Sequence, residues 1–428
     1  MVQLFLRREV SRLRYVIIGN SAAGIGTVEG IRQVDKDGEI IIITDEPYHT
    51  YSRPLISYLF LGKTTEEKMK YRSNDFYEKN NCTLLKSKKV TEIDPNKKVV
   101  ITSDGDKIGY DKLLIGTGSS PFVPPMEGLD TVENKFTFMS LDDAKELKKS
   151  ITIPEAKVLI IGAGLIGLKC AEGILNKVKE ITVIDLAPNI LSSILDSDGS
   201  KIVQKHLENK GFNFRLNQSV KTFSGNKGIL NNGESIEFDV LVLAVGVRPN
   251  TQLAQNIGCE VNRGIVVNNK METSKQYIYA AGDCIENFDV SSGQNRIMAL
   301  LPNAYMEGEC AGINMAGGDA YFDKAIPMNS IGFFGLYIIT AGSYNGDFYL
   351  ENDGSNYKKI FYEDNKLNGY ILIGNVEKAG IYTSLIKERT PLDTIDFQLI
   401  CQKPGLMAFT KEDRRIKLGG GINEYRCN

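Results

Sequence analysis

Two segments of the chain share one hydrophobic pattern, in which a short apolar run leads into small residues, then a longer helical stretch, then a second apolar run. The first segment starts with Tyr15–Ile18, continues to about Val34 and ends in Glu39–Ile43. The second begins with Val158–Ile161 and ends in Ile181–Asp185. Apolar runs that alternate with helical stretches are typical of βαβ units, so the pattern predicts two parallel sheets.

The first apolar run leads directly into a glycine turn, Gly19-Asn-Ser-Ala-Ala-Gly24. In a dinucleotide-binding turn Gly19 permits the tight bend and Gly24 lets the helix pack against the strand, while Ser21 replaces the middle glycine. Asp45 follows 21 residues after Gly24, close to the spacing of the carboxylate that binds an adenosine ribose. Taken alone, this imperfect motif is equally compatible with an ordinary glycine-containing turn.

The second turn carries the complete pattern, with Gly162, Gly164 and Gly167 opening a helix. A pyrophosphate would lie at the positive end of that helix, held by backbone N–H groups. Asp185, 18 residues after Gly167, would bind the 2′-hydroxyl of a nicotinamide dinucleotide. Leu186 follows it instead of an arginine suited to a 2′-phosphate. The turn therefore favours NADH over NADPH.

Three further apolar runs end in small residues: Leu113–Gly118, Leu241–Gly246 and Ile278–Asp283. Each would let the chain leave a nucleotide-binding lobe close to a cofactor. In the third, Asp283 follows Gly282 and can approach a ribityl hydroxyl or cap the next helix. Any one run could be a plain crossover turn, but five such features in this order are hard to explain that way.

In this order the motifs resemble the FAD-dependent pyridine nucleotide-disulfide oxidoreductase family, and Ala244-Val-Gly-Val-Arg-Pro-Asn250 matches one of its signatures. The resemblance implies an α/β fold with two Rossmann-like dinucleotide-binding domains, for FAD and NAD, and a C-terminal α+β interface domain. The boundaries it implies are 1–120 and 246–320 for the FAD-binding domain, 121–245 for the NAD-binding domain, 321–390 for the interface domain and 391–428 for a basic C-terminal extension.

Within the family, the segment Glu46-Pro-Tyr-His-Thr-Tyr-Ser-Arg-Pro-Leu-Ile-Ser57 is similar to the branch that lacks the redox disulfide. This branch contains NADH:rubredoxin reductases, ferredoxin reductases and nitrite reductase flavin domains. Disulfide reductases need a cysteine in this region, and it has none. The closest pair among the seven cysteines is 25 positions apart, so no zinc or iron–sulfur ligand spacing exists, and we expect no metal site.

The motifs and the resemblance together imply a set of cofactor contacts. For FAD these are Gly19, Ser21, Ala22, Ala23, Gly24, Asp45, Glu46, Arg53, Val90, Thr117, Gly118, Gly282, Asp283 and Leu301. For NAD(H) they are Gly162, Gly164, Gly167, Asp185 and Gly246. Arg53 would pair with a flavin phosphate, with a surface arginine before Pro54 as the alternative. Val90 would bond adenine through its backbone, and an ordinary core strand residue explains it equally well.

Two residues of the second helix are candidates for the reaction itself. Ile166 would lie at the flavin–nicotinamide contact, although a helix-face isoleucine usually only packs. Many relatives carry a glutamate two positions after the third glycine, paired with a lysine near flavin N5, whereas this chain has Lys169 and Tyr58 at those positions. We hypothesise that Lys169 brings a positive charge beside flavin N5 or the nicotinamide amide, which would stabilise reduced anionic flavin. The alternative is a solvated helical lysine.

Composition narrows the function classes further. The 51 Lys and Arg against 53 Asp and Glu give a net charge of −2, so no nucleic-acid partner is indicated. The longest uncharged apolar stretch, Ile331–Gly342, is too short to span a bilayer. Residues 1–14 carry four arginines and no long apolar run, so we do not expect them to be a secretory signal. Scattered cysteines in odd number are typical of reduced intracellular thiols. We therefore expect a soluble cytoplasmic protein whose chemistry belongs to a bound cofactor.

The last quarter of the chain predicts a mostly antiparallel sheet followed by a helix. Short strands are expected at 322–326, 330–342, 347–349, 358–362 and 367–374, and a helix at 377–389. The basic stretch from Thr390 to Asn428 either docks on a partner subunit or is strapped over its own domain. The second alternative is favoured.

These inferences predict an enzyme, an FAD-dependent oxidoreductase that exchanges hydride with NAD(H) and electrons with a rubredoxin- or ferredoxin-type carrier or an iron–sulfur partner subunit. One alternative is an NADH oxidase or diaphorase that reduces oxygen or small acceptors. The other is a non-catalytic FAD- and NAD-binding subunit. The identity of the carrier, the direction of electron flow and the oligomeric state, a homodimer included, stay open.

Overall fold

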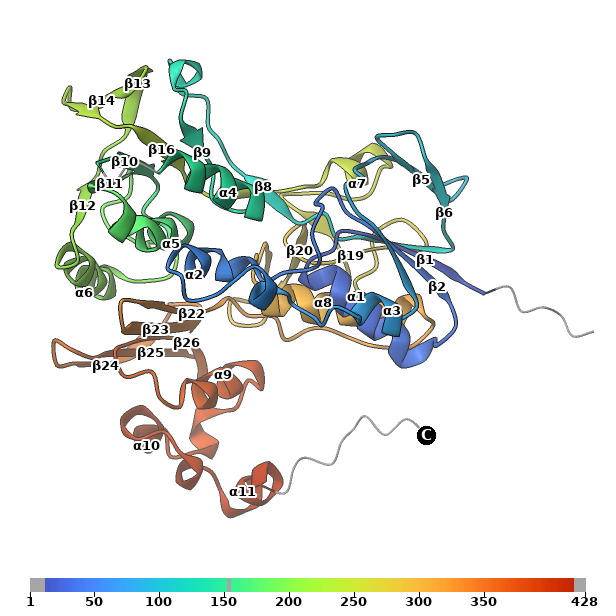
Figure 1. Ribbon diagram of the computed structural model, residues 1–428. Helices are drawn as coiled ribbons and strands as arrows, with labels where there is room; N and C mark the ends of the chain where they lie inside the picture. Colours follow the sequence, from blue (N-terminus) through green and yellow to red (C-terminus); the bar gives the residue numbers. More distant parts are fainter. Residues whose placement is uncertain (1–11, 152–154, 419–428) are drawn as a thin grey trace, which may run out of the picture. The chain divides into compact units, whose positions relative to one another are not determined.

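The computed structural model describes residues 12–151 and 155–418 (Figure 1). The chain divides into two compact units, one from residues 1–120, 247–288 and 295–323, and the other from residues 121–246, 289–294 and 324–428. The start of the predicted FAD-binding domain, the end of the predicted C-terminal extension and Cys427 lie outside the described residues.

The first unit is built on a five-stranded parallel sheet in the order β19-β7-β1-β2-β3. Its strands are β1 (Arg14–Ile18), β2 (Glu39–Ile43), β3 (Cys82–Leu85), β7 (Lys112–Ile115) and β19 (Ile278–Ala280). The central strands are almost entirely buried, which explains why they are continuous apolar runs in the sequence. All carboxyl ends of a parallel sheet meet at one edge, so the turns after β1, β2, β7 and β19 are neighbours.

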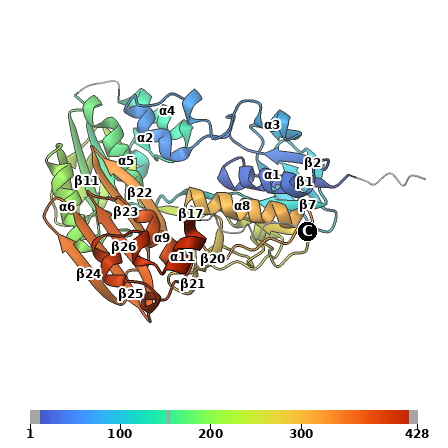
Figure 2. The same cartoon turned by 90° about the horizontal axis from the view of Figure 1, so that it is seen from below.

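Two helices, α1 (Ala22–Val34) and α8 (Leu301–Met315), lie side by side in this unit, as Figure 1 and Figure 2 both show. Glycines make the contact. A Cβ atom at Gly26 would lie 2.2 Å from the carbonyl oxygen of Tyr305, and one at Gly308 would lie 2.0 Å from that of Ala23. The two backbones therefore touch at positions that accept only glycine, which fixes the position of α8 against the first glycine turn.

Several short elements complete the first unit or join it to the second. An antiparallel sheet contains β4 (Val90–Asp94), β5 (Val99–Thr102) and β6 (Lys107–Gly109). The other strands are β8 (Ser119–Pro121), β17 (Val247–Pro249), β18 (Ile265–Val266), β20 (Ile285–Asp289) and β21 (Gln294–Arg296), and the short helices are α2 (Ile56–Phe60), α3 (Phe76–Lys79) and α7 (Gln252–Asn256).

The second unit contains a second parallel sheet, in the order β12-β11-β10-β16-β9. Its strands are β9 (Lys135–Phe136), β10 (Lys157–Ile161), β11 (Glu180–Asp185), β12 (Phe212–Leu216) and β16 (Val240–Leu243), and its helices are α4 (Leu141–Ser150), α5 (Leu165–Ile174) and α6 (Ser197–Glu208). A small antiparallel sheet of β13 (Val220–Ser224), β14 (Lys227–Leu230) and β15 (Ser235–Glu237) accompanies it. The two parallel sheets confirm the predicted α/β class.

The C-terminal part of the second unit is an antiparallel sheet in the order β22-β23-β26-β25-β24, with α9 (Ala379–Lys387) after its last strand. The strands are β22 (Met328–Phe333), β23 (Leu336–Gly342), β24 (Asp347–Asn352), β25 (Tyr357–Glu363) and β26 (Lys366–Ile373). The single strand predicted at 330–342 is wrong, because the chain reverses at Phe334 and Gly335, both with positive φ. The strand predicted at 322–326 is also wrong, since only one bridge, from Asp289 to Ala325, forms there.

The segment after α9 packs onto the sheet domain from which it extends. It contains α10 (Phe397–Gln402) and α11 (Lys411–Leu418). Ile400, Cys401 and Phe409 are buried in the same core as the sheet and α9, and the Tyr382 hydroxyl donates a hydrogen bond to the Ile400 carbonyl (3.0 Å). As far as Phe409, the structure therefore supports the alternative in which the extension is strapped over its own domain.

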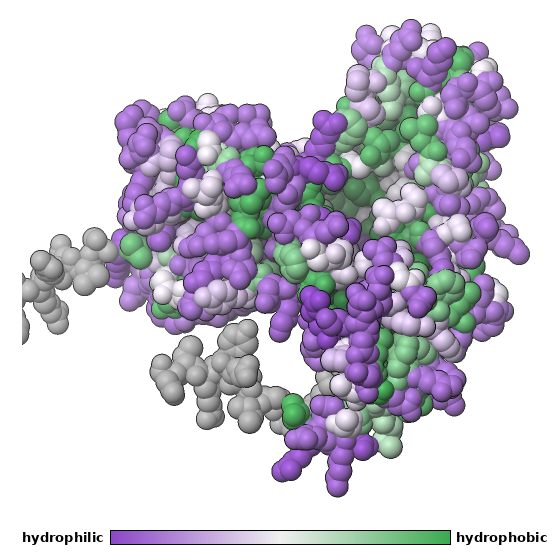
Figure 3. Space-filling model, turned by 180° about the vertical axis from the view of Figure 1, so that it is seen from behind, coloured by the Kyte–Doolittle hydropathy of each residue, from purple (hydrophilic) through white to green (hydrophobic). Residues whose placement is uncertain are grey.

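Hydrophilic side chains dominate the face in Figure 3, and hydrophobic ones form patches between them. In the ranges that the structure describes, we find no helix with both the length and the apolar character that crossing a membrane requires.

Candidate functional site

The first glycine turn lies at the carboxyl edge of the first sheet. The Gly19 N–H donates to the Ile43 carbonyl (2.8 Å), so the turn starts directly between β1 and β2. Gly19 has a φ of +111°, and a Cβ there would lie 2.1 Å from the Gly116 carbonyl oxygen; a Cβ at Gly24 would lie 2.1 Å from that of Gly19. The tight turn predicted from the motif is therefore present, and the fold itself requires both glycines.

Helix α1 begins in this turn with its first N–H groups uncapped by a side chain. Ser21 is the N-cap residue, yet its hydroxyl makes no capping hydrogen bond, and Ala22 and Ala23 open the helix. The first turn of a helix presents free N–H groups and a partial positive charge, which together bind anions. The start of α1 is thus suited to a pyrophosphate.

A charged cluster faces the same edge of the sheet. Arg53 forms an ion pair with Glu46 (2.6 Å). Asp283, directly after the positive-φ Gly282, accepts a hydrogen bond from the Ser119 hydroxyl (2.9 Å). Burial raises the pKa of Asp283, although that hydrogen bond and the charge of Arg53 oppose the shift. The structure therefore brings together three of the predicted FAD residues, and Asp45 follows β2 at the same edge.

Buried polar atoms without partners lie on the segment that carries Arg53. The hydroxyls of Thr50 and Ser57 are each on residues that are 2% exposed, and neither has a hydrogen-bond partner in the described structure. The Thr50 N–H donates to the Tyr77 hydroxyl (3.2 Å), which donates to the Asn20 side chain (2.7 Å) in the glycine turn. Buried polar groups are normally paired. Two orphaned hydroxyls, one of them on a residue whose backbone is linked to the glycine turn, fit a large polar ligand such as FAD.

Other predicted FAD residues have different environments. The Thr117 hydroxyl donates to the Asn250 carbonyl (2.6 Å), so its side chain holds the crossover between chain segments. Gly118 has positive φ and open space beside it, Val90 is a buried residue of β4, and Leu301 begins α8. Their contacts with FAD stay predictions. Thr50 and Ser57 were not singled out by sequence reasoning, because nothing local marks a hydroxyl that will lack a partner.

The second glycine turn follows β10, and its three glycines have two kinds of surroundings. A Cβ at Gly162 would lie 2.2 Å from the Ala244 carbonyl oxygen, and one at Gly167 would lie 2.0 Å from that of Gly162. A Cβ at Gly164 would meet nothing within 4 Å. The fold therefore requires the first and third glycines, whereas the middle glycine borders open space. That is the arrangement a pyrophosphate needs if it is to approach the backbone.

Asp185 stands at the end of β11 against this turn. One of its carboxylate oxygens accepts from the Ala163 N–H (2.7 Å) and the other from the Ala187 N–H (2.8 Å). The aspartate thus braces the turn, a role that spacing alone did not reveal. Leu186 beside it is 72% exposed. Gly246 has positive φ with open space next to it. Binding of NAD(H) by these residues stays a prediction.

Lys169, on α5, is not solvated, so that alternative is wrong. Its ammonium donates to Glu172 (2.7 Å) and to the Gly332 carbonyl (2.6 Å), and its side chain is 14% exposed. The second Glu172 oxygen accepts from the Phe334 N–H (3.1 Å). The pair therefore fastens the β22–β23 turn to the helix of the second glycine turn. Its predicted role beside the flavin stays a prediction, as does that of the half-buried Ile166 on the same helix.

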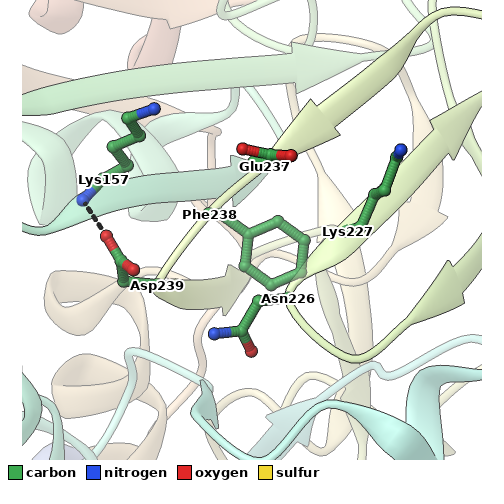
Figure 4. Close-up of a pocket in the computed structure, with 6 residues that line it drawn as sticks. All are labelled: Lys157, Asn226, Lys227, Glu237, Phe238 and Asp239. Carbon is green, nitrogen blue, oxygen red and sulfur yellow. Dashed lines mark hydrogen bonds between the residues drawn. The ribbon is translucent and has the colours of Figure 1, made fainter.

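The hollow in Figure 4 is at the wrong edge of the sheet for a nucleotide. It is lined by Lys157, Asn226, Lys227, Glu237, Phe238 and Asp239. The Lys157 N–H donates to the Asp239 carboxylate (2.8 Å), which joins the amino ends of β10 and β16. The glycine turn lies at their carboxyl ends, so this hollow has no part in the candidate site.

The described cysteines do not have the environment of reactive thiols. All six are unpaired, and Cys82 is the one that is not buried. Burial raises the pKa of Cys284 to about 11 and that of Cys310 to about 12, whereas redox and nucleophilic cysteines have lowered values. Among the described residues there is also no group of His, Cys, Asp and Glu that could hold a metal ion.

Comparison with known proteins agrees with this geometry. Residues 13–308 match the family model "Pyridine nucleotide-disulphide oxidoreductase", and residues 327–390 match "Rubredoxin NAD+ reductase C-terminal domain". The NADH oxidase of Methanocaldococcus jannaschii is 35% identical over 321 residues, 72% of this chain and 71% of that protein. The assimilatory nitrate reductase electron transfer subunit of Bacillus subtilis is 32% identical over 394 residues, 89% of this chain. The chain spans 50% of the length of that relative.

Among solved structures, the covalent putidaredoxin reductase–putidaredoxin complex superimposes with a TM-score of 0.84 at 23% identity, covering 91% of this chain and 96% of that one. At this identity the likeness shows the fold alone. The matched family model covers most of the chain and both glycine turns. The chain therefore belongs to the pyridine nucleotide-disulphide oxidoreductase family, whose cofactors are FAD and NAD(H).

Proposed function

We propose that the protein is an FAD-dependent oxidoreductase that exchanges hydride with NAD(H) and single electrons with an iron–sulfur carrier. The observation that carries this proposal is the presence of two glycine turns, each at the carboxyl edge of its own parallel sheet. One edge has a charged cluster and orphaned buried hydroxyls, and the other has open space beside its middle glycine. Such a pair of sites is suited to two different dinucleotides.

The residues of the first edge would hold FAD. The uncapped start of α1 would bind the pyrophosphate, Asp45 the adenosine ribose and Asp283 the ribityl chain, with Arg53 supplying the compensating positive charge. When bound, FAD supplies the conversion between hydride transfer and single-electron transfer. At the second edge Asp185 would select NADH, because its carboxylate accepts a ribose hydroxyl and repels a 2′-phosphate.

Two features support an external electron carrier. The described cysteines are unpaired thiols with raised pKa values, and all of them except Cys82 are buried, so a sulfur relay within the described chain is not supported. Residues 327–390 match a domain model named for rubredoxin reductases, and one relative is named as an electron transfer subunit. We propose a rubredoxin- or ferredoxin-type protein, or an iron–sulfur partner subunit, as the carrier. The unpaired thiols also favour a cytoplasmic location.

Anaerobic rapid mixing tests the proposal. The FAD-loaded protein is mixed with NADH or, in parallel, with NADPH, and the reduced protein is then mixed with rubredoxin, with a ferredoxin or with oxygenated buffer. We expect NADH to reduce the flavin faster than NADPH does, and an iron–sulfur protein to reoxidise it faster than oxygen does. Flavin that NADH fails to reduce would leave only a non-catalytic nucleotide-binding role.

An NADH oxidase is the second candidate, favoured by the 35% identity with the protein of that name from Methanocaldococcus jannaschii. The same experiment separates the two. If oxygen reoxidises the reduced flavin at least as fast as any iron–sulfur protein does, the oxidase assignment replaces the carrier.

A further inference from the structure

A second carboxyl group lies behind the turn that carries Asp283, and nothing in the proposed reaction uses it. Glu307, on α8, is 2% exposed. One of its oxygens accepts from the Gly282 N–H (2.9 Å) and the other from the Asn287 side chain (3.2 Å). Close packing against α1 at Gly308 fixes the backbone of α8 next to Glu307. Glu307 thus holds the backbone next to Asp283 through its hydrogen bond with the Gly282 N–H.

The surroundings of Glu307 lack a compensating cation. In the described part of the chain its hydrogen bonds come from Gly282 and Asn287 alone, and no Lys or Arg forms an ion pair with it. The titratable groups that face it are the Asp283 carboxylate and the thiols of Cys284 and Cys310. The cation of this region, Arg53, faces Asp283 and is paired with Glu46.

Burial in these surroundings favours the neutral acid. It raises the pKa of Glu307 to about 7, against the two hydrogen bonds that its carboxylate accepts, and the nearby charge of Asp283 adds to the increase. A carboxyl group with a pKa near 7 gains or loses its charge at the neutral pH at which enzymes work. The burial of Glu307 and the nearby charge of Asp283 therefore both disfavour a further negative charge beside the Gly282–Asp283 turn.

We propose that Glu307 is a positioning residue of the flavin site, and that it binds a proton when the Gly282–Asp283 turn receives the negatively charged FAD. This inference rests on the proposed FAD site. The proton comes from solvent and adds to one oxygen of the carboxylate, which leaves the other oxygen to accept the Gly282 N–H. The proton offsets one of the negative charges that the phosphates of FAD bring, since a neutral carboxyl group replaces a carboxylate.

The sign of the pH effect follows by linkage. Bound FAD brings negative charge, so it raises the proton affinity of Glu307, and binding takes up a proton in the range between the free and bound pKa values. The affinity for FAD is therefore highest at low pH and falls as pH rises through neutrality. A rise of one pKa unit on binding corresponds to a change of up to ~10-fold in the dissociation constant.

The experiment measures the FAD dissociation constant of the full chain from about pH 6 to about pH 8 by flavin fluorescence, a clean signal because the chain has no tryptophan. The variants are Glu307→Gln and, as a matched control on the same helix, Glu309→Gln, whose side chain bonds Gln33 (2.7 Å). With a rise of one pKa unit on binding, we expect the dissociation constant of the wild type and of Glu309→Gln to rise ~5-fold from about pH 6 to about pH 8. That of Glu307→Gln should stay near the low-pH value.

Infrared spectroscopy gives a second readout, whose titration is measured on the wild type alone. The apoprotein should show a neutral carboxyl C=O band that disappears near pH 7 in the wild type, and the band should be missing from folded Glu307→Gln. The inference is overturned if no such band titrates, or if wild type and Glu307→Gln share one pH profile for FAD. Failure to bind FAD at every pH would instead overturn the proposed function.

Discussion

Replacing Lys169 by Met removes the ammonium that fastens the β22–β23 turn to α5. In the wild type this ammonium contacts Glu172 and the Gly332 carbonyl, and the Glu172 side chain is 4% exposed. Met has a similar length and no charge, so the substitution leaves the Glu172 carboxylate buried with the Phe334 N–H as its remaining hydrogen bond. The Gly332 carbonyl loses its donor at the same time.

The expected cost follows from the burial of the pair. Removing one partner of a buried ion pair costs ~3–5 kcal/mol, because the other charge is left uncompensated. Because Glu172 keeps its hydrogen bond from the Phe334 N–H, we expect a cost at the lower end of this range, ~3 kcal/mol. This cost corresponds to a ~10²-fold increase in the equilibrium constant for opening of the β22–β23 turn. In Lys169→Met/Glu172→Gln both charges are gone and the amide can accept from Phe334. That double variant should therefore lie within ~1 kcal/mol of the wild type.

Amide hydrogen exchange of the full chain, read on peptides that span 328–342, measures this opening directly. Lys201→Met is the control, because Lys201 forms an exposed pair with Asp198 (3.6 Å, side chains 70% and 57% exposed) and should change protection by less than ~0.5 kcal/mol. Unchanged protection in Lys169→Met would show that the ion pair does not hold the β22–β23 turn. A flavin potential that is altered in both Lys169 variants, while the double variant regains protection, would support the separate role of Lys169 beside the flavin.

Four further substitutions test the second unit. Gly164→Ala should leave the thermal unfolding midpoint unchanged and weaken NADH binding measured by titration, whereas Gly167→Ala should also lower that midpoint, because its Cβ would lie 2.0 Å from a backbone oxygen. Asp185→Asn should raise the NADH dissociation constant ~10-fold, since a charged acceptor is lost, and should lower the one for NADPH, since the repulsion of its 2′-phosphate is lost as well. Burial alone would raise the pKa of Asp196, but hydrogen bonds from Lys359, Tyr357 and a backbone N–H lower it. This carboxylate therefore contributes stability above its ordinary pKa that is lost as pH falls through the folded value. Asp196→Asn should accordingly make the unfolding midpoint less sensitive to acid, and an unchanged acid profile would contradict that contact.

Much of the fold could be predicted from the sequence because local signals and tertiary requirements coincide. The strands that end before Gly19 and Gly162 are continuous apolar runs because both faces of each parallel sheet are covered. Each turn needs its glycines for steric reasons that act within a few residues of the turn or on its neighbouring strand. The two glycine motifs were therefore sufficient to predict where both candidate sites lie.

The features that the sequence did not reveal depend on contacts between distant segments. Glu172 meets Phe334 across 162 positions of the chain, and the orphaned hydroxyls of Thr50 and Ser57 are recognisable only once their surroundings are folded. The reversal at Phe334 was missed because an aromatic residue with positive φ occupies a place where a turn residue is expected. Glu307 was missed because an acid within a helix is ordinarily exposed.

The most direct test of the account is an anaerobic titration of the FAD-loaded full chain with NADH, followed through the flavin absorbance and repeated on Gly164→Ala. We expect one equivalent of NADH to bleach the wild-type flavin, and Gly164→Ala, which should bind FAD equally well, to need a large excess. A chain that takes up no FAD, or a bound flavin that NADH does not reduce, would contradict the proposal that the protein binds FAD and NAD(H) and passes hydride between them.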